Sequence, residues 1–213
     1  MIYKEKINEL LSNHLKPHLS EYDFKQFRSS RQFKRVFDNG YWHFEIIVNS
    51  SQKYNCDFLT YNLRYYLDDT EAIVRRIAGN MYRKGYMTGG CQLGNLMSPG
   101  VHYESYIDPA AIIEDVAYDV IYHFDKYAVP LINKYTSASD FYKGVTDNKE
   151  IAFSLNNKFH RSAINILAGN YSEAIKILSE MPEGHFGSPT KSECIIIANK
   201  IIEELSNDID KKQ

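Results

Sequence analysis

An Asn-Gly pair between two alternating runs is the feature that most limits how this chain can fold. Residues 33–37 read FKRVF, residues 41–48 read YWHFEIIV, and Asp38-Asn39-Gly40 lies between them. Asn-Gly in this position favours a type I′ β-turn, because both central residues of that turn have positive φ. We therefore expect an antiparallel hairpin. The residues expected on its buried face are Trp42, Phe44, Ile46 and Val48.

A third strand is expected from Tyr54 to about Leu67, and the phase of its apolar residues changes along its length. Cys56 and Phe58 alternate in one phase, whereas the apolar residues from Leu59 onward alternate in the other. Either a β-bulge near Phe58 or Leu59, or partial cover of both faces of the strand, would produce this change. The three strands together indicate a β-meander.

Helical periodicity surrounds the meander and also interrupts it. Apolar spacing near the start of the chain predicts a helix that ends at Pro17. A second helix is expected from Asp68 to about Ala78, and a glycine-rich hairpin across residues 86–106. From Asp108 onward the pattern is helical, and Pro130 is expected to kink or divide the first long helix.

These elements predict an α+β fold, in which helices pack on one face of an antiparallel β-meander sheet and an all-helical C-terminal part follows. We expect residues 1–145 to form the α+β domain, and residues 146–213 to form a helical extension packed on it, so that the two parts make one compact unit. The chain of 213 residues is long enough to bury a core without a disulfide or metal.

Composition narrows the class of protein further. Hydrophobic residues make up 44% of the chain and charged residues 24%, which is typical of a globular protein. The three cysteines form no CxxC pair or disulfide framework, which fits a reducing cytoplasm. No signal-peptide pattern is present, and no apolar run approaches the roughly 18 residues of a membrane span. We expect a cytoplasmic protein without cofactor, metal site or membrane partner.

Basic and aromatic residues interleave between residues 24 and 37. The cations are Arg28, Arg31, Lys34 and Arg35, and the rings are Phe24, Phe27, Phe33 and Phe37. One interpretation is a core edge along which Arg side chains extend to solvent. The other is a binding surface, for which the modest charge favours an acidic protein partner over nucleic acid. In a strand, Arg35 shares a face with Phe33 and Phe37, and Lys34 lies on the opposite face.

Two further sets of side chains are candidate functional residues. Tyr61 and Tyr65 share one face of the third strand, and that face is a second candidate binding surface. Cys91 would be a candidate nucleophile with His102 as its base, if the glycine-rich hairpin places them opposite each other. Nothing in the sequence supplies a third, orienting group or an oxyanion hole for this pair. We therefore assign no catalytic residue.

The order of these elements resembles the bacterial domain-of-unknown-function family 4304 over roughly residues 5–145. The residues that carry the resemblance are Trp42, Phe44, Ser51, Gln52, Phe124, Tyr127, Pro130 and Phe141. The resemblance implies no known activity, substrate or catalytic residue, although many such small bacterial domains are encoded among toxin–immunity genes. Residues 163–175 are similar to the middle of one tetratricopeptide repeat, and an ordinary helical hairpin is the alternative interpretation.

We expect a non-enzymatic protein-interaction module, immunity- or antitoxin-like, whose partner presents an acidic surface. One alternative is a nucleic-acid-associated protein that uses residues 25–35. The other is a small Cys-dependent hydrolase or transferase built on Cys91 and His102.

Overall fold

A computed structural model of the chain describes residues 1–82, 87–147, 158–181 and 189–210. The fold is α+β, as the sequence predicts. The chain divides into two compact units. Unit 1 contains residues 1–65 and 90–136, and unit 2 contains residues 66–89 and 137–213. The division differs from the expected boundary near residue 145, because residues 66–89 belong with the C-terminal helices.

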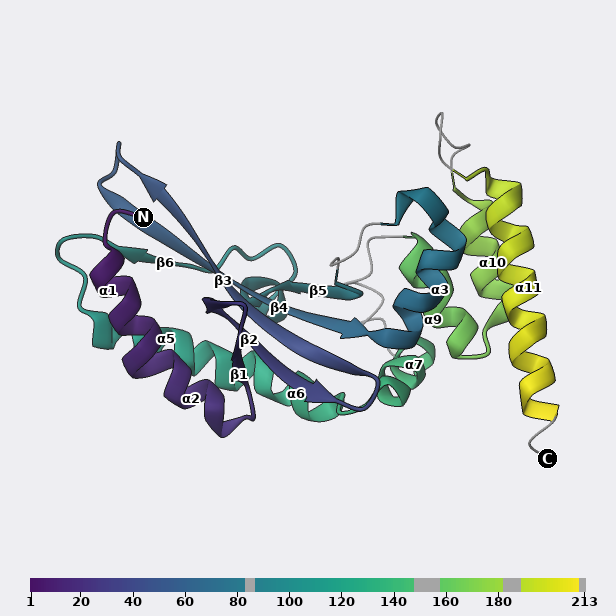
Figure 1. Cartoon of the computed structure of the whole chain (residues 1–213). Helices are drawn as coiled ribbons and strands as arrows, with labels where there is room; N and C mark the ends of the chain where they lie inside the picture. Colours follow the sequence, from purple (N-terminus) through teal and green to yellow (C-terminus); the bar gives the residue numbers. More distant parts are fainter. Residues whose placement is uncertain (83–86, 148–157, 182–188, 211–213) are drawn as a thin grey trace. The chain divides into compact units, whose positions relative to one another are not determined.

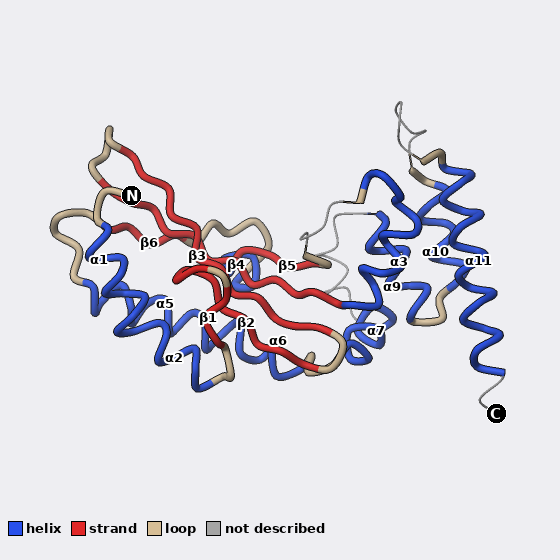
Figure 2. Tube along the Cα trace, viewed as in Figure 1, coloured by secondary structure: helices blue, strands red, loops and turns tan. Residues whose placement is uncertain are grey.

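Unit 1 is built on a six-stranded antiparallel sheet with the order β1-β2-β3-β4-β5, and β6 also pairs with β4. The strands, drawn red in Figure 2, are β1 (Lys25–Phe27), β2 (Ser29–Phe37), β3 (Gly40–Ser51), β4 (Cys56–Leu67), β5 (Gly89–Gln92) and β6 (Glu104–Ile107). β2 to β4 form the predicted meander, and β1, which the sequence did not predict, adds a further strand beside β2.

The hairpin of β2 and β3 forms as predicted, but its turn is one residue earlier than expected. Phe37 pairs with Gly40, so the two residues of the turn are Asp38 and Asn39, and Gly40 begins β3. Asn39 has a φ of 58°, the left-handed conformation that Asn tolerates better than other side chains with a Cβ. The expectation of positive φ at both Asn39 and Gly40 was therefore wrong.

The pairing of β4 with β6 shows no bulge at the phase change, and successive buried residues show that both faces of β4 are covered there, the other predicted explanation. The register of β4 against β6 is regular from Asp57↔Ile107 to Thr60↔Glu104, across the position where a bulge was expected. Asp57 occupies the phase of Leu59 and accepts hydrogen bonds from the backbone N–H groups of Ile2 and Tyr3. A buried carboxylate therefore replaces an apolar residue at this position and attaches the start of the chain to the sheet.

The expected hairpin across residues 86–106 does not form. β5 and β6 lie beside β4 instead of pairing with each other, and the short helix α4 (Leu93–Met97) separates them in the chain. Gly90 explains part of the glycine content, because a Cβ added there would lie 2.4 Å from the Cα of Arg64. At Gly90 the backbone therefore packs too closely against β4 to leave room for a side chain.

The helices of unit 1 are continuous through both prolines. The first rod consists of α1 (Lys4–Glu9), the π-helix η1 (Leu10–Leu15) and α2 (Lys16–Glu21), and the second of α5 (Ile113–His123), the π-helix η3 (Phe124–Ala128) and α6 (Val129–Lys134). The expected end at Pro17 was therefore wrong. In both rods a π-helical turn precedes the proline and widens the backbone, which makes room for the ring.

These helices cover one face of the sheet (Figure 1). The ring of Phe44 on β3 packs edge-on against Phe124, with 5.1 Å between centroids. Trp42 is buried, and its indole N–H donates a 3.0 Å hydrogen bond to the carbonyl of Tyr135. The core of unit 1 lies between the sheet and the two helical rods.

The described part of unit 2 is mainly helical and also contains the ends of β4 and β5. Its helices are α3 (Asp68–Ala78), α7 (Ala138–Asp147), α9 (Lys158–Leu167), α10 (Tyr171–Ser179) and α11 (Lys191–Asp210). α3 ends at Gly79 with a φ of 52°, as the sequence predicts. α9 and α10 form the expected helical hairpin about Gly169. Their apolar residues share a core with α3 and α11. None of the helices in the described ranges is both long and apolar enough to cross a membrane.

Candidate functional site

The pleat of β2 divides the predicted basic cluster between the two faces of the sheet. Arg35 pairs with Trp42, and its guanidinium donates a 3.4 Å hydrogen bond to Asn133 of α6. Arg35 therefore lies on the helix-covered face, and alternation along the strand places Arg31 in the same phase. Lys34 pairs with His43 on the opposite face. The four cations do not form a single surface.

The face opposite the helices carries a cluster of cations stacked on aromatic rings. The ammonium of Lys34 lies 3.9 Å from the ring centroid of Tyr41 and 5.2 Å from that of Phe27. The guanidinium carbon of Arg28 lies 4.7 Å from the centroid of Phe27. We call Phe27, Arg28, Lys34 and Tyr41 the cation–aromatic face. Lys25 pairs with Lys34 across β1 and β2, and such like-charged neighbours leave the positive charge unbalanced.

His43 is buried beneath this face. It is only 3% exposed, and neither ring nitrogen has a hydrogen-bond partner among the residues that the structure describes. The ring of Phe27 stands edge-on to it at 6.1 Å. Burial lowers the pKa of His43 to about 4, and the positive charges of Arg64, Arg28 and Lys34 act in the same direction. At neutral pH the imidazole is therefore uncharged.

Glu45 is the carboxylate closest in sequence to His43 on this face, and both of its oxygens are occupied. Arg64 forms a 3.1 Å ion pair with Oε2, and the Gln32 amide donates a 2.9 Å hydrogen bond to Oε1. Glu45 raises the pKa of His43, but this effect is smaller than that of burial. Because Glu45 is engaged by Arg64 and Gln32, the charges of Arg28 and Lys34 remain available to an incoming anion.

Tyr61 and Tyr65, the second predicted binding surface, belong to the core. Tyr61 is 0% exposed and stacks on Phe44 at 6.3 Å, and Tyr65 packs edge-on against Trp42 at 5.7 Å. Burial raises the pKa of Tyr61 above its ordinary value. These two tyrosines share the phase of Leu59 and Leu63, so that they face the helices and do not offer a surface to a partner.

Cys91 and His102 lie on separate segments of unit 1. Cys91 is half-buried in β5, whereas His102 is exposed in the loop before β6, and the two strands pair separately with β4. No hydrogen bond joins the two side chains in the described part of the chain. Burial raises the pKa of the Cys91 thiol to about 11, the opposite of the change that activates a nucleophilic cysteine.

Sequence reasoning missed a buried polar group in unit 2. The imidazole Nε2 of His160 on α9 lies 2.9 Å from Glu71 Oε1, and the Thr88 hydroxyl donates to the same oxygen at 2.8 Å. Glu71 is 1% exposed and His160 5%. The burial of Glu71 has a local signal in the sequence. Glu71 lies three and seven residues before Val74 and Ala78 on α3, and this spacing places it on the same buried face of the helix. The partner, 89 residues further on, has no such signal.

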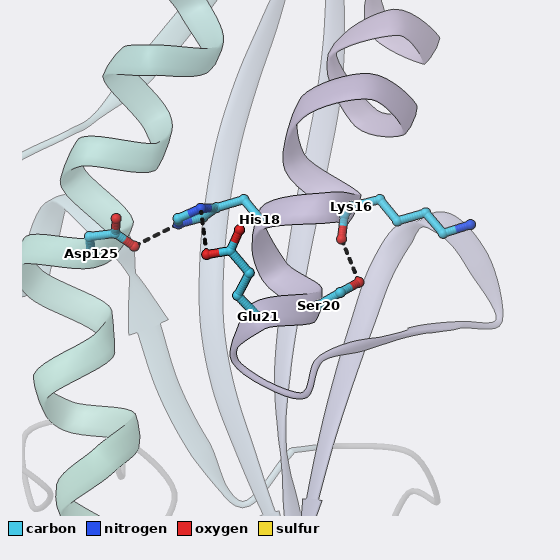
Figure 3. Close-up of polar contacts among 5 residues, drawn as sticks. All are labelled: Lys16, His18, Ser20, Glu21 and Asp125. Carbon is cyan, nitrogen blue, oxygen red and sulfur yellow. Dashed lines mark hydrogen bonds and ion pairs between the residues drawn. The ribbon is translucent and has the colours of Figure 1, made fainter.

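His18 links the two helical rods of unit 1 (Figure 3). Its Nε2 lies 2.7 Å from the carboxylate of Asp125, and its Nδ1 lies 3.9 Å from Glu21. The ring also packs edge-on against Phe124. Both nitrogens therefore have partners, and the residue joins α2 to η3. Within the described ranges, no group of three or more His, Cys, Asp or Glu side chains is placed to hold a metal ion.

No protein-family model matches this chain, and comparison with curated proteins and with solved structures gives no match.

Proposed function

We propose that the chain is a non-enzymatic protein-interaction module that uses the cation–aromatic face to bind a partner protein with acidic side chains. The observation that carries the proposal is the pair Arg28 and Lys34. Neither side chain has an ion-pair partner among the described residues, and both are held against aromatic rings. Such stacking limits the freedom of the cations before a partner arrives, which lowers the entropy cost of binding them.

The residue types of this face suit a protein partner. Tyr, Phe and Arg are enriched where proteins meet, because they bring large apolar area together with a polar group. A carboxylate that meets Arg28 and Lys34 replaces no existing ion pair. Electrostatic complementarity of this kind increases the rate of association and falls with ionic strength.

Nucleic acid is the alternative partner for this face, and the net negative charge of unit 1 disfavours it. Unit 1 holds 12 Lys or Arg and 13 Asp or Glu residues, for a net charge of −1. Within unit 1, residues 25–35 form a local stretch with five Lys or Arg and no Asp or Glu. Binding to a phosphate backbone usually depends on several neutralised phosphates, whereas binding to a few carboxylates requires only a local group of cations.

The immunity- or antitoxin-like role, and the cytoplasmic setting, belong to this proposal as well. The support for the role is the resemblance over residues 5–145 to a bacterial family of the same element order. A protein that neutralises a toxin by binding needs an interaction surface and no catalytic group. The cation–aromatic face supplies such a surface.

The proposal is tested with a fluorescein-labelled peptide of alternating Glu and Ser, by fluorescence anisotropy in low salt. We expect the reversal of both cations, Arg28→Glu with Lys34→Glu, to weaken binding at least tenfold. The matched control, Lys16→Glu with Lys53→Glu, makes the same charge change in unit 1 away from this face, and we expect less than a twofold effect. Equal losses in the two variants would show that net charge alone drives binding, and the face would be excluded.

A further inference from the structure

We propose that His43 is the receptor for a carboxylate of the acidic partner, which enters beneath the ring of Phe27, lies between Arg28 and Lys34, and accepts a hydrogen bond from the imidazole N–H. This inference rests on the proposed function, and it names the atom at which the partner is recognised.

The first step is the state of His43 in the free protein. A neutral imidazole carries one donor and one acceptor, and both need a partner when they are removed from water. Neither has one among the described residues, although the side chain is 97% buried. Buried polar groups in folded proteins are almost always hydrogen-bonded. An incoming group that pairs with His43 therefore removes a cost that the free protein bears.

The second step is the chemistry of that group. The positive charges of Arg28, Lys34 and Arg64 lower the pKa of His43, and the negative charge of Glu45 raises it. Glu45 is already held by Arg64 and Gln32. The site therefore offers donors and positive charge, which an anionic acceptor satisfies. A carboxylate fits because its two oxygens can accept from a guanidinium and from an imidazole N–H at the same time.

The third step is how the carboxylate reaches a buried nitrogen. Phe27 covers His43 from the turn between β1 and β2, where the pairing register shifts between Gln26 and Phe27. Arg28, the residue at the tip, has a φ of 59°. A long side chain in this left-handed region is strained, and strained residues are found at segments that change conformation for function. The turn is thus suited to swing Phe27 away from His43.

Binding of a carboxylate at His43 makes the affinity for the partner depend on pH. The charged groups that face His43 are Glu45, Arg64, Arg28 and Lys34. Burial and the three positive charges lower the pKa of His43 to about 4, and the charge of Glu45 opposes them. A bound carboxylate adds negative charge, which raises the pKa of His43 in the complex. Because the complex then binds a proton more readily than the free protein, affinity increases as the pH falls from neutral toward the pKa in the complex. Glu side chains of the partner stay ionised down to about pH 5.

The test follows the His43 ring proton by NMR in the full chain, with and without the alternating Glu and Ser peptide. We expect the ring to titrate at a higher pH with the peptide, and peptide affinity to increase at least threefold from pH 7.5 to 5.5. In His43→Gln we expect weaker binding that no longer changes over this range. Phe27→Ala serves as a second variant, in which His43 should titrate closer to its ordinary value without any peptide.

The outcomes separate the two proposals. Absence of peptide binding at every pH would overturn the proposed function together with this inference. Binding that depends on Arg28 and Lys34, but leaves the His43 titration and the pH profile unchanged, would overturn the inference alone. Inorganic phosphate is the third arm. A shift of the His43 resonance with phosphate at the concentration at which the peptide acts would show a general anion site, and the assignment to a partner's carboxylate would be wrong.

Discussion

Buried polar side chains are the residues at which this protein departs from an ordinary apolar core. His43 in unit 1 has neither nitrogen paired in the described structure, whereas Glu71 in unit 2 accepts from both His160 and Thr88 through one oxygen. The Thr88 hydroxyl in turn accepts a 2.9 Å hydrogen bond from the Leu67 backbone N–H. Glu71 thus holds β4, α3 and α9 together, and we interpret it as a structural residue. His43 makes no side-chain hydrogen bond among the described residues, which favours a binding role over a structural one.

Replacement of Glu71 by alanine should destabilise the protein strongly. The change leaves His160 Nε2 and the Thr88 hydroxyl buried without their acceptor, which costs about 3 kcal/mol. Urea unfolding followed by far-UV circular dichroism at pH 7 measures the loss. The matched control is Glu204→Ala, which removes an exposed ion pair with Arg76 and should leave the midpoint nearly unchanged. Similar midpoints for the two variants would show that the Glu71 group contributes no stability.

Trp42 provides a second test at the level of a single residue. It is the only tryptophan in the chain, it is buried, and it donates a hydrogen bond to Tyr135. We expect native emission at shorter wavelength than that of free indole in water, and slow quenching by acrylamide, because the ring has no contact with solvent. Emission like that of free indole, or rapid quenching, would contradict the packing of β3 against α6.

Prolines show where local sequence rules fail at the level of an element. The sequence predicts a helix end at Pro17 and a kink or division at Pro130, whereas each proline follows a π-helical turn inside a continuous rod. The helix interior penalises proline through the lost N–H and through the clash of its ring with the preceding turn. A π-turn relieves that clash, and it has no local sequence signal that could have been found. The two rods are joined by a long-range contact, that of His18 in α2 with Asp125 in η3, which no local pattern predicts.

Deletion of Asn13 tests this account of the first rod. Asn13 is exposed in η1, and its removal should let the wide turn close to an α-helical one. Pro17 then lies in a regular helix interior, at a cost of about 3 kcal/mol. We expect the deletion to lower the melting temperature by several degrees, and Pro17→Ala in the deletion variant to restore most of it. An equal loss with and without Pro17 would mean that the wide turn does not serve the proline.

For the whole molecule, sequence patterns predicted the class of fold but not its division into units. Alternation and helical periodicity are local, and they placed the meander, α3 and the α9–α10 hairpin correctly. Long-range pairing is not local. β5 and β6 both reach β4 across the chain, and α3 shares a core with α9 and α11. For this reason the expected glycine-rich hairpin does not form, and the division into units differs from the expected boundary near residue 145.

The same distinction holds for the candidate site. Strand alternation was enough to separate Lys34 from Arg35, because the pleat is a local property. It could not show that Tyr61 and Tyr65 are covered by the helices. Nor could it show that Phe27 folds back over His43, which depends on the shifted register of β1. Of the predicted binding residues, the proposed site keeps Arg28 and Lys34, and it adds His43.

The charge difference between the two halves of the sequence disappears when charges are counted for each structural unit. Residues 1–100 hold 14 basic and 10 acidic side chains, and the remainder holds 11 and 17. Unit 1, however, holds 12 and 13, and unit 2 holds 13 and 14, so that each carries −1. The difference in net charge between the two halves of the sequence is therefore not a difference in net charge between the two units. What remains is a local patch of positive charge on one face of the sheet.

Because unit 1 is slightly acidic apart from one local basic patch, we expect it to bind an acidic peptide more tightly than DNA. We expect a fluorescein-labelled single-stranded 20-mer DNA to bind more weakly than about 100 μM at 150 mM NaCl, the weak limit of nonspecific binding. The acidic peptide should compete with the oligonucleotide for Arg28 and Lys34 at low salt. Micromolar DNA binding at 150 mM NaCl, with a steep salt dependence, would instead require several phosphate contacts. Unit 1 would then have to offer more cations than this face holds, and the nucleic-acid alternative would replace the protein partner.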